Sequence, residues 1–220
     1  MRNYIILITE MLLCYVFITI LYKKYKTDGL LSYSVTATII STILSKQEID
    51  ILNTEVPLGM GITISLVIVA NIITQNRGKD EVNNLLLLVL VTSLTSYCFL
   101  SLSGMINPSM INEYANKSYD SIFQYNIRLY LANTISLLLS IYLSSRIYYS
   151  LKRIKNKIII SNVFSILIVE FVDNIIFIVI SYLYIKEIPQ IILALVLRYM
   201  IKTAMGLIGT IPIYIIKKIN

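Results

Sequence analysis

The sequence predicts an all-α integral membrane protein, and its composition, its hydropathy and the spacing of its apolar runs all indicate this class. Hydrophobic residues make up 57% of the 220-residue chain and charged residues only 14%, whereas about a quarter of the residues in soluble domains are charged. The mean hydropathy is +0.77. Because backbone polar groups in lipid must be satisfied within their own segment, we expect the apolar runs to form helices.

The apolar runs predict a bundle of about seven transmembrane helices, a six-helix core plus an N-terminal helix. Each run comes close to or exceeds the ~20 residues that a helix needs to cross the hydrocarbon core. We expect spans at residues 4–22, 29–45, 57–75, 84–103, 125–149, 158–185 and 189–216. Little sequence remains for a soluble part, so residues 1–220 are expected to form a single transmembrane domain.

The first apolar run is expected to remain in the mature chain. It is longer than the hydrophobic region of a signal peptide, and no small-residue cleavage site follows it. The long connection at 104–124 contains an Asn-Pro turn signal and is expected to be a loop on the outer side. The two cysteines indicate neither a disulfide framework nor a metal site, and no cofactor is expected; both, Cys14 and Cys98, lie in apolar runs.

The distribution of Lys and Arg predicts that the N-terminus lies outside and the C-terminus in the cytoplasm, because cytoplasmic loops are enriched in these residues. The connections after the first, third and fifth spans, together with the C-terminus, hold Lys23, Lys24, Lys26, Arg77, Lys79, Lys152, Arg153, Lys155, Lys157, Lys217 and Lys218. The opposite side holds only Arg2, Lys46, Lys117 and Lys186. Membrane topology thus accounts for the net charge of +7, and no nucleic-acid partner is expected.

Four ionisable residues lie deep in the last two predicted spans. Glu170 and Asp173 are three positions apart, and Arg198 and Lys202 are four apart, so each pair shares one face of its helix. Unpaired, the four charges would cost on the order of 10–14 kcal/mol in lipid. We therefore expect Asp173 to face Lys202, with the other two nearby, around a water-accessible cavity. The alternative is a static ion pair that only joins two helices.

Four amide side chains are further binding candidates. Asn71 and Gln75 end the third predicted span, Asn133 lies in a polar row with Ser136 and Ser140 on the fifth, and Asn162 precedes the acids in the sixth. An amide both donates and accepts hydrogen bonds, so it can match the edge of a purine-like ring. Arg128, near the outer start of the fifth span, is either an interfacial anchor or a charge at the mouth of a cavity.

The order of these features resembles the VUT (vitamin uptake transporter) family of small membrane transporters over nearly the whole chain. The stretches that carry the resemblance are LYKKYKTDGLLSYSVTATIISTILSKQEIDI, PLGMGITISLVIVANIITQNRGKDEV, NVFSILIVEFVDNIIFIVISYL and RYMIKTAMGLIGTIPIY. Matched position by position, the resemblance supports Gly59, Gly78, Arg128, Asn162, Ser165, Asp173, Tyr199, Lys202, Thr210, Pro212 and Tyr214. It therefore adds Tyr199 to the candidate binding residues.

The resemblance implies a multi-pass transporter of the cell (cytoplasmic) membrane that imports a queuosine precursor. Such 7-deazaguanine compounds are flat heterocycles used to modify the wobble base of tRNA. This chain departs from the family pattern at several positions: Asn71 stands where the family has Asp, Gln75 where it has Glu, Ser144 where it has Asp, and Glu170 where it has Gln. These changes bear on the substrate and on any coupling ion.

Other functions stay open at this stage. Transport could be proton-coupled through Glu170 or Asp173, or it could be facilitated diffusion. The chain could instead be the substrate-capturing subunit of a multi-component uptake system or a scaffold without ligand, and in any of these roles it could form a homodimer. An enzyme is not expected, because the chain has no His for a metal-binding HExxH and no Gly-x-Ser-x-Gly.

Overall fold

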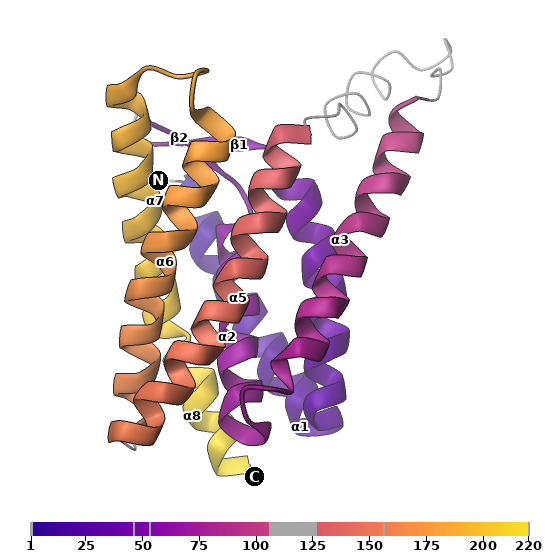
Figure 1. The fold of residues 1–220 in the computed structure, drawn as a ribbon, viewed down its shortest axis with the longest axis vertical. Helices are drawn as coiled ribbons and strands as arrows, with labels where there is room; N and C mark the ends of the chain where they lie inside the picture. The colour runs from indigo at the N-terminus through magenta and orange to yellow at the C-terminus, as the bar shows by residue number, and fades with distance from the viewer. Residues whose placement is uncertain (1, 46, 53, 106–126, 156, 220) are drawn as a thin grey trace.

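A computed structural model describes residues 2–45, 47–52, 54–105, 127–155 and 157–219. These residues form a helical bundle with a small two-stranded sheet at one end (Figure 1). The elements are α1 (Arg2–Leu44), β1 (Glu48–Ile51), β2 (Thr54–Pro57), α2 (Met60–Arg77), α3 (Val82–Gly104), α5 (Ile127–Lys155), α6 (Ile158–Tyr182), α7 (Ile188–Ile208) and α8 (Thr210–Ile219). The predicted helical class is confirmed, and the predicted loop at 104–124 lies almost wholly outside the described residues.

Helix α1 is a pair of antiparallel arms joined at a sharp break. Lys26 has φ 54° and ψ −132°, which is not a helical conformation. The arms come so close at the break that a Cβ on Gly29 would lie 2.4 Å from the carbonyl oxygen of Leu21, so only glycine fits there. The spans predicted at 4–22 and 29–45 correspond to these two arms.

Helix α2 occupies the centre of the bundle. All its residues from Met60 to Thr74 are buried, because α1, α3, α5, α7 and α8 all pack against it. A helix that is apolar on every side, like the run ISLVIVA within it, is expected in such a central position.

Strands β1 and β2 form an antiparallel hairpin in which Glu48 pairs with Pro57 and Ile51 with Thr54. The sequence analysis did not predict it, and it moves the start of α2 from residue 57 to Met60. The hairpin is tied to the α6–α7 connection by Lys186, whose Nζ lies 2.7 Å from Glu55 Oε2 and 3.5 Å from Glu48 Oε2.

The C-terminal helix is interrupted near its end. The predicted span at 189–216 is divided into α7 and α8 at Gly209. Pro212 lies in the first turn of α8, where its missing N–H costs no intrahelical hydrogen bond. Gly206 and Gly209 let this part of the chain approach α2 and α6 closely, since a Cβ on Gly206 would lie 2.8 Å from Ile166 Cγ2.

The two ends of the bundle carry different elements. The N-terminus and the β-hairpin lie at one end and the C-terminus at the other (Figure 1). The break in α1 lies beside the C-terminus, because Lys26 Nζ donates to the Ile219 carbonyl at 3.5 Å. Among the described residues, the stretches long and apolar enough to cross a membrane are 3–44, 82–104, 127–154, 158–182 and 188–219. The seven-span count and the orientation of the termini stay predictions.

Candidate functional site

Helices α6 and α7 lie side by side and bring the four predicted charges together. On α6 the buried face includes Glu170 and Asp173, and on α7 it includes Arg198 and Lys202. The short connection between the helices makes them antiparallel neighbours (Figure 1). We call these four residues the charge cluster.

Lys202 lies between the two acids of the charge cluster. Its Nζ is 2.6 Å from Asp173 Oδ2 and 2.8 Å from Glu170 Oε2. Arg198 Nη2 donates to the same oxygen of Asp173 at 3.1 Å. All four side chains are at most 3% exposed. The cluster thus balances two positive against two negative groups that are all buried, as the high cost of a buried unpaired charge requires.

The two acids have different surroundings. Asp173 accepts hydrogen bonds from Lys202 and Arg198, and its Oδ1 accepts a third from Ser140 Oγ of α5 at 3.1 Å. Glu170 contacts Lys202 only, at 2.8 Å from Oε2, and its Oε1 lacks a hydrogen-bond partner among the described residues. Asp173 is therefore the more firmly held carboxylate.

Arg198 has a second, unpaired side. Its guanidinium carbon lies 3.6 Å from the centroid of the Phe177 ring, so the group stacks on the ring face. Its Nε and Nη1 have no hydrogen-bond partner within the described part of the chain. A cavity of about 10 Å³ adjoins Arg198, Phe177 and Asn133. The water-accessible cavity that we expected is therefore no larger here than the space for about one water molecule.

A second polar group joins α2, α5, α6 and α8. Asn71 Nδ2 donates to Asn162 Oδ1 at 2.9 Å, and Asn162 Nδ2 donates to Thr210 Oγ1 at 2.8 Å. Ser144 Oγ donates to Asn71 Oδ1 at 2.8 Å and lies 2.9 Å from Ser165 Oγ. Two predicted residues, Asn71 and Asn162, are thus brought together, and each amide group is hydrogen-bonded inside the protein.

Two predicted residues lie apart from both groups. Gln75, near the C-terminal end of α2, accepts a hydrogen bond from Tyr148 OH at 2.7 Å through its side chain. Tyr199 donates to the Leu167 carbonyl at 3.3 Å, and its ring meets Phe171 edge-on. Phe171 is 52% exposed, so Tyr199 faces the outside of the bundle.

Arg128 supports the end of a helix. Its Nε and Nη2 donate to the carbonyls of Ile180 and Leu183 at the C-terminal end of α6. The last carbonyls of a helix lack intrahelical partners and carry partial negative charge, so a guanidinium stabilises them. Neither of the two roles that we considered for Arg128 includes this capping contact.

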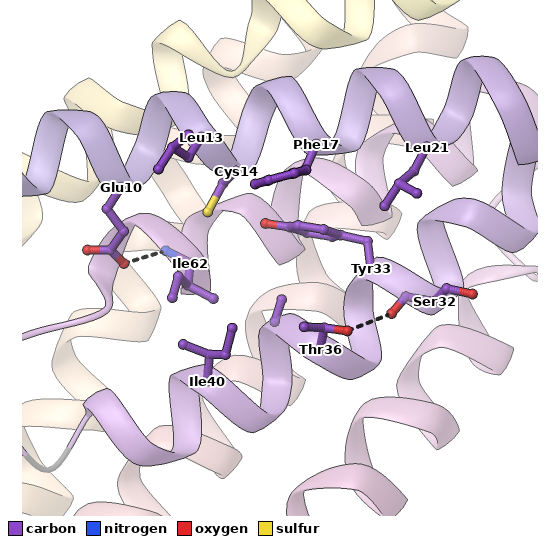
Figure 2. Close-up of a pocket in the computed structure, with 11 residues that line it drawn as sticks. Glu10, Leu13, Cys14, Phe17, Leu21, Ser32, Tyr33, Thr36, Ile40 and Ile62 are labelled. Atoms are coloured by element: carbon purple, nitrogen blue, oxygen red, sulfur yellow. Dashed lines mark hydrogen bonds between the residues drawn. The ribbon is translucent and has the colours of Figure 1, made fainter.

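A larger cavity, of about 510 Å³, lies between the arms of α1 (Figure 2). Figure 2 shows Glu10 and Ile40 at one end of it and Leu21 and Ser32 at the other. Glu10 Oε1 accepts a hydrogen bond from the Ile62 backbone N–H at 3.3 Å, in the first turn of α2. The lining is largely apolar, and the cavity contains no paired charges like those of the charge cluster.

Sequence reasoning missed Phe177, and it identified Asn133 and Ser140 only through the polar row on the fifth span. Nothing separates Phe177 from the other apolar residues of its helix, except that it lies four positions after Asp173 and hence on the same face. Ser140 and Asn133 belong to a polar row on the fifth span, and that row was the available signal.

Comparison with known proteins gives one family. The model of the family described as "Putative vitamin uptake transporter" matches residues 57–216, which include α2, α3, the charge cluster and most of α8. No curated protein and no solved structure matches the chain. The family and the long apolar helices together make this a multi-pass membrane protein. Because the match covers well over half of the sequence, the chain belongs to the vitamin uptake transporter family.

Proposed function

We propose that the chain imports a queuosine precursor, a 7-deazaguanine-type base, or a similar small heterocycle across the cytoplasmic membrane. Residues 1–220 act in this proposal as one transport domain. Membership of a transporter family supports the general activity. The resemblance of the binding stretches to those of the queuosine precursor transporters supports the choice of substrate.

The observation that carries the proposal is the charge cluster. Buried ion pairs seldom stabilise a fold more than apolar residues of the same volume would, so their presence requires another reason. Ionisable residues inside membrane helices commonly mark the path of a substrate or a proton. Asp173, Lys202 and Arg198 are accordingly the proposed substrate-contact residues, and Glu170 completes the charge balance.

Glu170 is the proposed site of proton uptake. Its carboxylate shares Lys202 with Asp173, and no other donor among the described residues contacts it. Protonation of Glu170 would remove one ion pair and leave the contacts of Asp173 with Lys202, Arg198 and Ser140 intact. The cluster would then carry one net positive charge. The protonated and deprotonated states of the protein would therefore differ in the charge at this site.

Uptake of a labelled 7-deazaguanine base by a host that lacks its own salvage transport tests the proposal. We expect the wild-type chain to support uptake, and we expect Asp173→Asn and Lys202→Met to reduce it by tenfold or more at equal amounts of inserted protein. Asp80→Asn, which makes the same change in an exposed ion pair with Arg146 outside the cluster, is the matched control. If both cluster variants transport normally, the charge cluster is only a link between helices.

The same host distinguishes a complete transporter from a substrate-capturing subunit. The chain contains no Gly-rich phosphate-binding loop of its own. Expressed alone, a complete transporter accumulates the base, whereas a capturing subunit binds it but needs a separate ATPase for uptake. Binding without uptake in the naive host would therefore favour the second arrangement.

A further inference from the structure

The small cavity beside Arg198 lies directly under the turn that joins β2 to α2. Its lining includes residues 57–60 of that turn, together with Asn133, Phe177 and Arg198. At about 10 Å³ it has room for about one water molecule. Arg198 of the charge cluster lines the cavity, and the turn at residues 57–60 separates it from the hairpin.

Arg198 presents unused hydrogen-bond donors beside this cavity. The side chain is 3% exposed, and Nη2 is engaged by Asp173 while Nε and Nη1 are unpaired among the described residues. Stacking on Phe177 fixes the plane of the guanidinium. A buried charged donor without an acceptor is costly, so this arrangement favours a partner that supplies one.

Asn133 supplies the complementary group. It lines the same cavity, and its Nδ2 donates to Ser41 Oγ at 3.2 Å. That contact directs one side of the amide toward α1 and leaves the amide oxygen as an acceptor for a further donor. A guanidinium that only donates thus adjoins an amide that can accept.

From this pairing we infer that the cavity is the closed form of a binding site for the cyclic-amide edge of an uncharged heterocycle. The ligand's carbonyl oxygen accepts from Arg198, and its adjacent ring N–H donates to the Asn133 amide oxygen. An uncharged ligand fits because the charge cluster is already balanced. The inference rests on the proposed function and specifies which edge of the substrate the site recognises.

The turn at residues 57–60 has to move for such a ligand to enter. Gly59 has φ 83°, a left-handed conformation that glycine adopts without strain, and it joins the hairpin to α2, so we expect the chain to bend there. The hairpin on its other side is held by Lys186 through Glu48 and Glu55. Tyr182 OH adds a hydrogen bond to Glu48 Oε1 at 2.5 Å.

Direct binding to the purified full chain in lipid nanodiscs tests the inference with two probes. One probe is 7-deazaguanine, and the other is the same base without the ring carbonyl, 2-amino-7-deazapurine. A site that hydrogen-bonds a buried group rejects the analogue that lacks the group, so we expect a preference for the carbonyl compound of about a hundredfold or more. Phe177→Leu and Asn133→Ala should each reduce this preference about tenfold.

Phe171→Leu is the matched control for Phe177→Leu, because it makes the same change on the exposed side of α6. Its preference should equal that of the wild-type chain. If wild-type protein binds both probes equally, or if both cavity variants keep the full preference, the inference is wrong and the proposed function stands. If wild-type protein binds neither probe, the proposed substrate is wrong and the inference falls with it.

Discussion

Lys202 Nζ lies 2.6 Å from Asp173 Oδ2, in a pair where neither side chain is more than 2% exposed. This contact joins α6 to α7 at the same level where Arg198 and Ser140 reach the carboxylate. Two helices are thereby fixed in register by charges rather than by apolar packing alone. The stability of the bundle should depend on keeping those charges balanced.

Removing Lys202 alone should destabilise the protein more than removing Lys202 and Asp173 together. Lys202→Met leaves two acids facing one base, and an unbalanced buried charge costs about 3–5 kcal/mol. In the double variant with Asp173→Asn, Glu170 and Arg198 still balance each other. The melting temperature in detergent should fall steeply for the single variant and recover in part for the double.

A thiol-reactive dye can follow this melting. Cys14 is buried and should react faster once the protein unfolds, whereas Cys98 is exposed, so the measurement uses a Cys98→Ser background. The chain contains no Trp to serve as an intrinsic probe. Equal melting temperatures for the single and double variants would show that charge balance does not govern the stability of the cluster.

Glu170→Gln should separate substrate binding from proton coupling. The amide keeps the size of the side chain but cannot take up a proton, while Asp173 keeps its three donors. We expect normal substrate exchange across the membrane and loss of the accumulation that an imposed proton gradient drives. Proteoliposomes with a set pH difference provide the measurement, and accumulation that still follows the gradient in this variant would exclude Glu170 as the coupling group.

Gly209→Ala should destabilise the protein by about 1–3 kcal/mol, the usual cost of an overpacked core. A Cβ there would lie 2.6 Å from Ile68 Cδ1 and 2.8 Å from Tyr15 OH. Combined with Ile68→Ala, the loss should be smaller than the sum of the two single losses, since the second change makes room for the first. Gly104→Ala, at an exposed position of α3, is the control and should cost little. If the two losses of stability are strictly additive, the strain in Gly209→Ala does not come from its contact with Ile68.

The hairpin should loosen in acid. Lys186 holds the pKa of Glu55 below its ordinary value of 4.5 through a hydrogen bond and its positive charge. A carboxyl whose pKa is lowered on folding stabilises the fold above its ordinary pKa, and that contribution is lost as the pH falls through the lowered value. For so exposed a pair we expect at most about 1 kcal/mol.

Amide hydrogen exchange of β1 and β2 can measure this loosening at pH values on both sides of that transition. Exchange rates corrected for their intrinsic pH dependence should rise in acid for the wild-type chain. In Glu55→Gln the rise over the same pH range should be smaller, because only the contacts of Glu48 with Lys186 and Tyr182 remain. A rise of equal size in both proteins would assign the effect to another group.

The sequence predicted the contacts among the buried charged residues of the candidate site, because few arrangements of the helices can pair those charges. Asp173 and Lys202 were expected to contact each other, because each unpaired charge inside the membrane carries a high free-energy cost. The same reasoning could not place Tyr199 or Gln75, since a Tyr or Gln near a helix end is satisfied equally well by a backbone carbonyl or a neighbouring hydroxyl. Phe177 could not be predicted as a site residue, because its position in an apolar helix does not distinguish it from the neighbouring apolar residues.

The helices were predicted more accurately than the connections. The helix predicted at 158–185 is observed at 158–182, and that predicted at 84–103 is observed at 82–104. The hairpin at residues 48–57 was missed because its strands are only four residues long and mix charged with apolar positions. Short strands of this kind depend on contacts such as Lys186 with Glu55, which are distant in the sequence.

The complete enclosure of α2 has a consequence for how the molecule can move. Because every residue from Met60 to Thr74 is covered by protein, its amides should be the slowest to take up deuterium and should do so only when the whole bundle opens. We therefore expect any conformational change of the bundle to move the peripheral helices about α2, and a change in bilayer thickness to act on α2 only through those helices.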